Sequence, residues 1–205
     1  MIDNTILTDT QIEIYRNEID ILCDNYIHSL PDENMIYKST VFSGMLNYLY
    51  RNKIKYIIEQ YRKDNNLNDY YNNYDLLDVI FNNIYIDICT RFNIVPSIIQ
   101  FSVFVNVDNG TLSDIKSGVY RDNGSKVNPI NCQTVKKWYA TCESMLLSKA
   151  TNENSIGSIF ALKSNFGYVE KGNELPTQET LTQSTPEQIA ERYKDAKLPE
   201  LPELE

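Results

Sequence analysis

Residues 96–118 read PSIIQFSVFVNVDNGTLSDIKSG, and this pattern predicts two short helices joined by a tight turn. Asn106 stands in the turn, and Asn is one of the few residues besides glycine that tolerate a left-handed backbone. Apolar side chains on both sides of the turn would form one inner face: Phe101, Val105, Val107, Leu112 and Ile115. The stretch is typical of a helix-turn-helix. An ordinary helical hairpin inside an all-α core would show the same spacing.

Signals at the ends of the two helices agree with this interpretation. Pro96 suits the first turn of the first helix. Asp108 suits the N-cap of the second helix, and Gly118 suits its stop. Ser102 is small enough to let the two helices approach closely.

In a DNA-binding motif, the second helix (residues 108–117) would read the DNA. The polar side chains of Asn109, Thr111 and Ser113 would point outward and can hydrogen-bond base edges or phosphates. Asp108 and Asp114 would lie near phosphates that repel them. The pattern therefore predicts the geometry of the motif, whereas tight DNA binding does not follow from this helix alone.

Basic side chains in and after the motif are the candidate phosphate contacts. They are Lys116, Arg121, Lys126, Lys136 and Lys137. A solvated charged face is the alternative interpretation of this cluster.

The composition bounds the class of protein. The chain has 205 residues, of which 42% are hydrophobic and 11% aromatic, which is enough to build a core. The formal net charge is −9, the reverse of a typical nucleic-acid-binding domain. Any DNA contact must therefore come from a local basic patch or from several copies acting together.

No metal or cofactor chemistry is predicted. The four cysteines have no CxxC spacing and there is a single histidine, His28, so a zinc site is not expected. Buried free thiols in a reducing cytoplasm are the better interpretation of Cys23, Cys89, Cys132 and Cys142.

Enzymatic and membrane functions are not predicted either. The GSK at residues 124–126 lacks the upstream glycine and the preceding strand of a phosphate-binding loop. No nucleophile–His–acid set and no convincing two-metal carboxylate cluster is present. No signal peptide and no apolar run long enough to cross a bilayer is found, so a cytoplasmic location is expected.

Apolar periodicity elsewhere predicts an all-α fold. Helices are expected over residues 8–30, 40–61, 75–92, 131–150 and 155–165, with loops at 32–38 and 120–130. A break is possible at residues 51–53, and a short hairpin at 120–130. The helix at 75–92 is apolar over so much of its circumference that it should be central.

These elements suggest four parts. Residues 1–62 would form an N-terminal helical arm, possibly for oligomerisation, and residues 63–74 a polar linker. Residues 75–170 would form the helix-turn-helix core domain, and residues 171–205 a disordered acidic tail.

The tail contains one candidate partner-binding segment. Residues 185–188, TPEQ, are a capping-box start with proline at the first helical position. The helix that follows is marginal alone, and spaced leucines come after it. The side chains expected to dock on a partner are Ile189, Tyr193, Leu198, Leu201 and Leu204.

The order of the central helix, the motif at residues 101–115 and the helix with Trp138 resembles a known family, and two further stretches resemble it most. SIGSIFALKSNFGYVE at residues 155–170 and TPEQIAERYKDAKLPELPE at residues 185–203 are similar to the small terminase subunits of tailed bacteriophages. The resemblance covers roughly residues 75–205, while residues before 75 match no pattern of the family and the acidic second helix departs from it.

The resemblance implies a function without catalysis. Small terminase subunits assemble into rings, recognise the packaging start on double-stranded viral DNA, and pass it to a large subunit with ATPase and nuclease activity. It therefore implies a homo-oligomer in the cytoplasm of the host cell, with DNA and the large terminase subunit as partners and without a cofactor.

Two other functions remain open. A transcriptional regulator with the same motif would typically dimerise and match half-sites one DNA turn apart. A structural or adaptor protein would use the motif for packing alone, and the net charge of −9 favours it.

Overall fold

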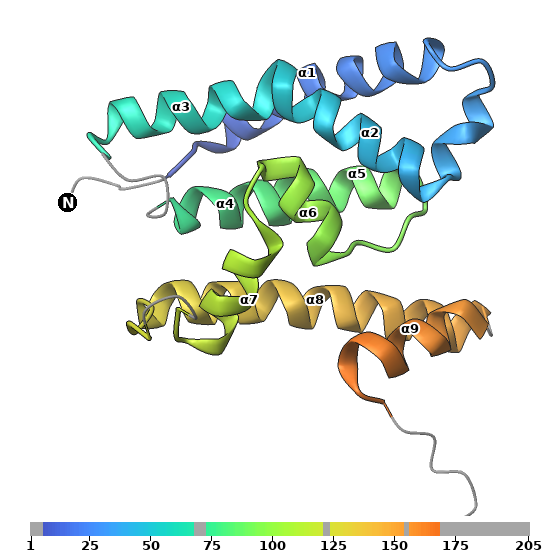
Figure 1. Ribbon diagram of the computed structural model, residues 1–205. Helices are drawn as coiled ribbons and strands as arrows, with labels where there is room; N and C mark the ends of the chain where they lie inside the picture. Colours follow the sequence, from blue (N-terminus) through green and yellow to red (C-terminus); the bar gives the residue numbers. More distant parts are fainter. Residues whose placement is uncertain (1–5, 68–72, 121–123, 154–155, 169–205) are drawn as a thin grey trace, which may run out of the picture. The chain divides into compact units, whose positions relative to one another are not determined.

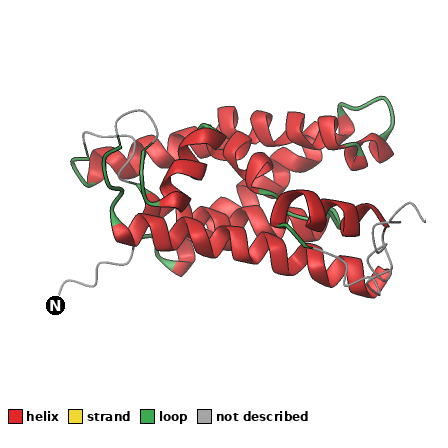
Figure 2. Cartoon of the chain, turned by 60° about the horizontal axis from the view of Figure 1, so that its bottom comes forward, coloured by secondary structure: helices red, strands yellow, loops and turns green. Residues whose placement is uncertain are grey.

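The computed structural model describes residues 6–67, 73–120, 124–153 and 156–168. Almost all of these residues are helical, and they form no strand, so the all-α prediction is confirmed (Figures 1 and 2). Residues 1–167 form one compact unit, to which the following description applies. Within it, α4 and α5 lie between α1–α3 on one side and α8 on the other (Figure 1).

The helices at the N-terminal end follow the predicted pattern with one difference, in the loop after α1. Helix α1 (Asp9–His28) begins in a capping box at Thr8, where the side chain accepts a hydrogen bond from the Gln11 amide. The predicted loop at 32–38 is instead mostly a 3-10 helix, η1 (Glu33–Tyr37), because Asp32 caps the amide of Asn34.

The possible break at residues 51–53 is a π-helical turn rather than an interruption. Helix α2 (Ser39–Leu49) continues through η2 (Tyr50–Ile54) into α3 (Lys55–Asp64). A π turn adds a residue to the helix without ending it. Ile54, Ile57 and Ile58 therefore stay on the buried face.

The central helix is also confirmed. It consists of α4 (Tyr74–Ile80), a π turn at η4 (Phe81–Tyr85) and α5 (Ile86–Arg91). Tyr74, which the sequence placed in the polar linker, is 2% exposed and stacks on Trp138 with ring centroids 6.1 Å apart. The segment predicted as a polar linker therefore begins within α3, which ends at Asp64, and finishes in two buried residues, Asn73 and Tyr74.

The two short helices at residues 96–118 are α6 (Ile98–Val105) and α7 (Asn109–Ser117). Asn106 between them has a left-handed backbone with φ 52°, as expected for the turn. Pro96 precedes the helix instead of lying in its first turn, because Ser97 is the N-cap of α6 and accepts a hydrogen bond from the Gln100 amide at 3.2 Å. The Tyr85 hydroxyl donates to the Ser97 carbonyl at 2.8 Å and fixes the start of α6 to the central helix.

A hairpin-like turn leads from α7 to α8. Gly118 ends α7 with φ 86°, and the Val127 amide donates to its carbonyl at 3.0 Å. Helix α8 (Pro129–Glu153) begins earlier than predicted, because Asn128 rather than Asn131 accepts a hydrogen bond from the Ile130 amide at 2.9 Å. Pro129 takes the first helical position, where its missing N–H costs nothing.

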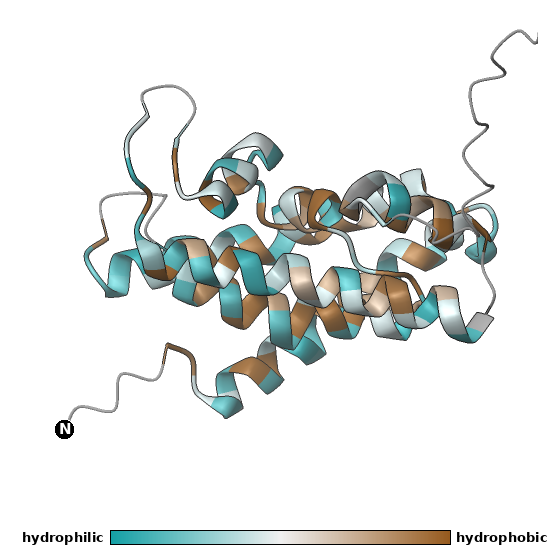
Figure 3. Ribbon diagram, turned by 90° about the horizontal axis from the view of Figure 1, so that it is seen from below, coloured by the Kyte–Doolittle hydropathy of each residue, from teal (hydrophilic) through white to brown (hydrophobic). Residues whose placement is uncertain are grey.

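Helix α9 (Ile156–Phe166) packs against α8. Gly167 stops it with φ 71°, and its amide donates to the Lys163 carbonyl at 3.2 Å. Figure 3 views this side of the unit, where hydrophilic and hydrophobic segments alternate along the helices.

One cluster of buried side chains joins the predicted arm to the predicted core domain. Phe42, Met45 and Leu46 of α2 are 0% exposed and belong to the same cluster as Phe101 and Trp138. Ion pairs at the surface add to this contact, since Arg91 of α5 lies 2.7 Å from Asp20 and 2.6 Å from Asp24 of α1. The buried apolar side chains of α1–α3 thus pack within the chain itself, while Ile14, Ile21 and Tyr56 remain exposed.

Candidate nucleic-acid interface

Helix α7 has an apolar inner face and a polar outer face. Leu112 and Ile115 are 0% exposed and pack into the core beside α8, as the sequence predicted. Asn109 and Ser113, one helical turn apart, are exposed, whereas Thr111 is half-buried and points about 160° away from Asn109 around the helix. The predicted base-contacting residues are therefore on the surface, with Thr111 the least accessible.

Asp108 acts as the predicted N-cap. Its Oδ1 accepts a hydrogen bond from the Thr111 amide at 3.2 Å. The carboxylate satisfies an amide that the helix leaves without a partner, and it complements the positive end of the helix dipole. The same charge would repel a phosphate at this end of α7, so the cap favours folding more than DNA binding.

Lys116 contacts α8. Its Nζ lies 3.9 Å from the ring centroid of Tyr139, a cation–π contact. Nearby, the Cys132 thiol donates to the Lys116 carbonyl at 3.5 Å. The lysine therefore helps to fix α7 on α8, a role that the sequence did not predict.

The flanking basic residues do not form a single patch. Lys126 is exposed in the turn before α8, where it pairs with Val119 in an isolated antiparallel bridge. Arg121 lies outside the described residues. Lys136 and Lys137 are both exposed on α8, but successive helical residues point about 100° apart.

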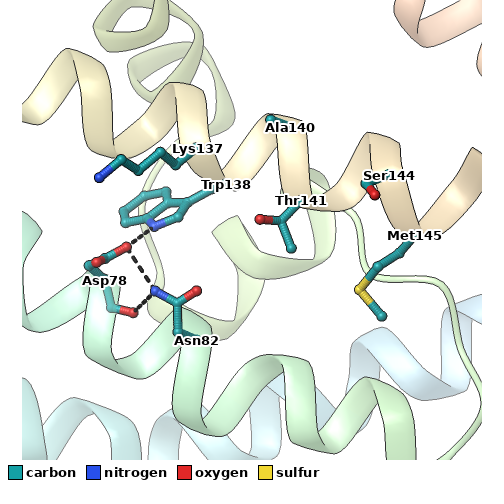
Figure 4. Close-up of a pocket in the computed structure, with 8 residues that line it drawn as sticks. All are labelled: Asp78, Asn82, Lys137, Trp138, Ala140, Thr141, Ser144 and Met145. Atoms are coloured by element: carbon teal, nitrogen blue, oxygen red, sulfur yellow. Dashed lines mark hydrogen bonds between the residues drawn. The ribbon is translucent and has the colours of Figure 1, made fainter.

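Lys136 and Lys137 accordingly belong to different sides of α8. Lys136 stands between Cys132 and Tyr139, the two α8 residues that touch Lys116, so it lies toward α7. Lys137 lines a hollow of about 610 Å³ toward α4, together with Asp78 and Asn82 (Figure 4).

One wall of this hollow carries the Asp78 carboxylate, which two hydrogen bonds hold in place. Asp78 accepts hydrogen bonds from Trp138 Nε1 at 2.6 Å and from Asn82 Nδ2 at 3.0 Å. A carboxylate beside Lys137 lowers the positive potential that a phosphate would meet there. Lys136 is thus better suited to a DNA contact than Lys137.

A second hollow, of about 520 Å³, lies behind the start of α7 and was not predicted. It is lined from the 95–100 segment, from Asn109 of α7, and from residues of α8 and α9 that are far apart in the sequence. Among the described residues, none that lines this hollow carries a charged side chain. The side-chain oxygen of Gln100, on its wall, is buried and has no hydrogen-bond partner among the described residues.

The cysteines do not form a metal site in the described part of the chain. All four are buried with free thiols, and no group of three potential metal ligands is found among the described residues. Burial raises the pKa of Cys23, Cys89 and Cys142 from 9.0 to about 12, so these thiols stay protonated at neutral pH.

The predicted partner-binding residues of the tail lie outside the described residues: Ile189, Tyr193, Leu198, Leu201 and Leu204. Within the described part, none of the helices combines the length and hydropathy that crossing a membrane requires. Comparisons of the chain with protein-family models, with curated proteins and with solved structures find no match.

Proposed function

We propose that this chain is a non-enzymatic, DNA-recognising packaging subunit, similar to the small terminase subunits of tailed bacteriophages. The observation that carries the proposal is the pair α6–α7. A left-handed Asn106 and an Asp108 cap hold α7 with Leu112 and Ile115 inward and a polar face outward. A helix-turn-helix bound to DNA places the polar face of its second helix in the major groove, and the outward polar face of α7 supports the proposal in this respect.

In this proposal, contacts with DNA bases and contacts with DNA phosphates come from different residues. Asn109, Thr111 and Ser113 face base edges, where amide and hydroxyl groups can read hydrogen-bond patterns. Lys116, Lys126 and Lys136 contact phosphates, joined by Arg121 and Lys137. Binding by one copy is weak because the chain carries a net charge of −9, so several copies in a ring act together.

Reversal of charge on α8 tests the DNA contact. Replacing Lys136 and Lys137 together by Glu should weaken binding to every DNA sequence and reduce the slope of affinity against salt by about 2, one for each phosphate contact. The single variants separate the two sides of α8, and Lys136→Glu should have the larger effect. Lys38→Glu, at an exposed lysine before α2, is the control for the single variants, because it changes the net charge by the same amount. Unchanged binding in the double variant would refute the DNA contact of α8.

The proposed tail contact has a separate test. Deleting residues 185–205 should leave the number of chains in the assembly and its DNA binding unchanged, while capture of the large terminase subunit in a pull-down is lost. Loss of assembly in the truncated protein would instead assign the tail to the oligomer.

An adaptor that does not touch DNA is the second candidate function. The contact of Lys116 with Tyr139 favours it, because that lysine already has a packing role. DNA titration at low salt distinguishes the two, since an adaptor shows no salt-dependent binding. A regulator is distinguished by mass, because it would form a dimer rather than a ring.

A further inference from the structure

We propose that the outer side of η2–α3 is a second surface for the phosphate backbone of double-stranded DNA, separate from α7 and α8. This assignment rests on the proposed function in one respect, that DNA is a partner of the chain. It gives a role to basic side chains that the fold leaves in solvent.

Basic residues are concentrated in this helical stretch. Residues 51–63 hold five of the 19 lysines and arginines of the chain and a single acidic residue, Glu59. The whole chain, in contrast, carries a net charge of −9. A local basic patch of this kind is what an acidic protein needs in order to bind a polyanion.

Four exposed side chains recur every four residues along the stretch: Arg51, Lys55, Glu59 and Lys63. Residues four apart form one row on a helix, so these side chains share its outer side. Lys55 and Lys63 are about 12 Å apart along the helix axis, which is comparable with the width of the major groove of B-DNA. Two lysines with this spacing can contact phosphates on both sides of a groove.

The opposite side of the helix is fixed in the core. Ile54, Ile57 and Ile58 are at most 3% exposed, so the helix cannot turn to present another face. Lys53 is also engaged, because it forms an ion pair with Glu18 of α1. The outer row therefore stands on a rigid support, and Lys53 is not part of it.

Glu59 limits the strength of this surface. Its Oε1 lies 3.8 Å from Lys55 Nζ, and the two side chains are 50% and 55% exposed. An ion pair this exposed contributes little to stability, so Lys55 can exchange the carboxylate for a phosphate. Glu59 also repels phosphates, which keeps binding by one copy weak and agrees with the proposed need for several copies.

The side chains of η2–α3 fit DNA better than a lipid surface. A helix that lies on a membrane inserts a face of large apolar side chains among the lipids. The isoleucines of this stretch point into the core instead, and among its described residues only Tyr56 is both large and exposed. Contact through charged side chains fits the regularly spaced phosphates of a duplex.

This surface is distinct from the DNA contact proposed for α8. Helix α3 lies with α1 and α2 on one side of the central helix, and α8 lies on the other side (Figure 1). Substitutions on one of the two surfaces should therefore leave the other intact.

Titration of a DNA duplex with the full-length chain at several salt concentrations tests the α3 surface. Replacing Lys55 and Lys63 together by Gln should weaken binding to every DNA sequence. The slope of log affinity against log salt should fall by about 2, one for each phosphate contact. Lys38→Gln, at an exposed lysine before α2, is the control for each single variant and should leave the slope unchanged. An unchanged slope in the double variant would overturn the proposal.

Glu59→Gln should have the opposite effect, which a folding defect cannot produce. It removes the acidic side chain from the row, so affinity for the duplex at low salt should rise several-fold. Glu33→Gln, at an exposed residue of η1, changes the net charge by the same amount and should have a smaller effect. A Glu59→Gln variant that binds the duplex no more tightly than Glu33→Gln would contradict the phosphate contact.

The results separate this surface from the proposed function. If neutralising Lys55 and Lys63 weakens binding but reversing Lys136 and Lys137 does not, the α3 surface holds and the contact proposed for α7 and α8 fails. If only the α8 variants weaken binding, the proposed function holds and the α3 surface is wrong. Binding of the wild type to phosphatidylserine vesicles through these lysines, with no binding to the duplex, would identify a lipid partner and overturn the proposal.

Discussion

At the scale of single residues, Trp138 connects the parts of the core. Its ring lies 5.5 Å from Phe81 and 5.1 Å from Phe101, measured between centroids, while Nε1 donates to Asp78. The side chain is 1% exposed, so its one polar atom needs this acceptor. The tryptophan thereby joins α8 to the central helix and to α6.

Substitution of Leu112 tests whether the inner face of α7 contributes to the stability of the fold. Because the side chain is 0% exposed, Leu112→Ala should lower the free energy of unfolding by about 2–5 kcal/mol. Chemical denaturation followed by Trp138 fluorescence measures the change. Ser113→Ala, on the exposed face of the same helix, is the control and should be close to neutral. A neutral Leu112→Ala would mean that α7 contributes no core contact.

The buried thiols predict a loss of stability in alkali. Unfolded thiols lose their protons above pH 9, whereas Cys23, Cys89 and Cys142 keep theirs in the folded chain until about pH 12. Their stabilising effect is therefore complete below pH 9 and declines as the pH rises from 9 to 12. The decline is about 1.4 kcal/mol per pH unit for each thiol.

Urea unfolding at pH 8, 10 and 11 measures this slope. Cys23→Ala removes one thiol, so the slope of the free energy of unfolding against pH should become shallower by about 1.4 kcal/mol per unit. A slope that does not change in this variant would show that Cys23 ionises equally in both states.

At the scale of elements, the end signals decide where helices begin and stop. Thr8, Ser97 and Asp108 each accept a hydrogen bond from an amide three residues later, which meets the needs of the first helical turn. Gly118 supplies the left-handed residue that ends α7. The π turns at η2 and η4 have no side-chain cap and stand inside continuous helices.

The Asp108 cap gives a prediction for α7. Asp108→Ala should lower the free energy of unfolding by about 1 kcal/mol, because the Thr111 amide loses its acceptor. Asp108→Asn keeps an acceptor oxygen and should retain most of the stability. It also removes a negative charge beside the proposed DNA-reading face. An alanine variant as stable as wild type would indicate that water replaces the cap without cost.

At the scale of the whole molecule, the helices before residue 65 and those after residue 73 share one core. Phe42 lies 6.2 Å from Phe92 between ring centroids, and Arg16 contacts Asp87 at 2.6 Å. Lys53 and Glu18 form a further ion pair between η2 and α1. The exposed pairs add little energy each, so burial of apolar side chains dominates this contact.

Removing residues 1–62 tests whether apolar burial against α1–α3 stabilises the helices that follow residue 73. The truncated chain should lose its cooperative unfolding transition, because Phe101, Ile84 and Ile88 lose the cover that α1–α3 provide. Circular dichroism melting and binding of a hydrophobic dye measure the effect. The control is removal of residues 171–205 only, which should leave the melting transition unchanged. A cooperative transition in the N-terminal truncation would show that residues 63–205 form an independent domain.

The sequence by itself determined the helices, their polarity and most of their ends. Periodicity placed Leu112 and Ile115 inward and Trp138 in the core, and residue type placed Asn106, Asp108 and Gly118 at the turn and caps. These features are local, since they depend on residues three or four positions apart and on backbone angles that few residues accept.

Only the tertiary structure decided which surfaces the helices make together. Burial of Tyr74 against Trp138, the contact of Lys116 with Tyr139, and the separation of Lys136 from Lys137 join residues with no pattern between them. The hollow behind α7 is formed by residues that span positions 95–166. Such contacts depend on how side-chain volumes fill the space between helices, and spacing along one helix carries no information about the neighbour across it.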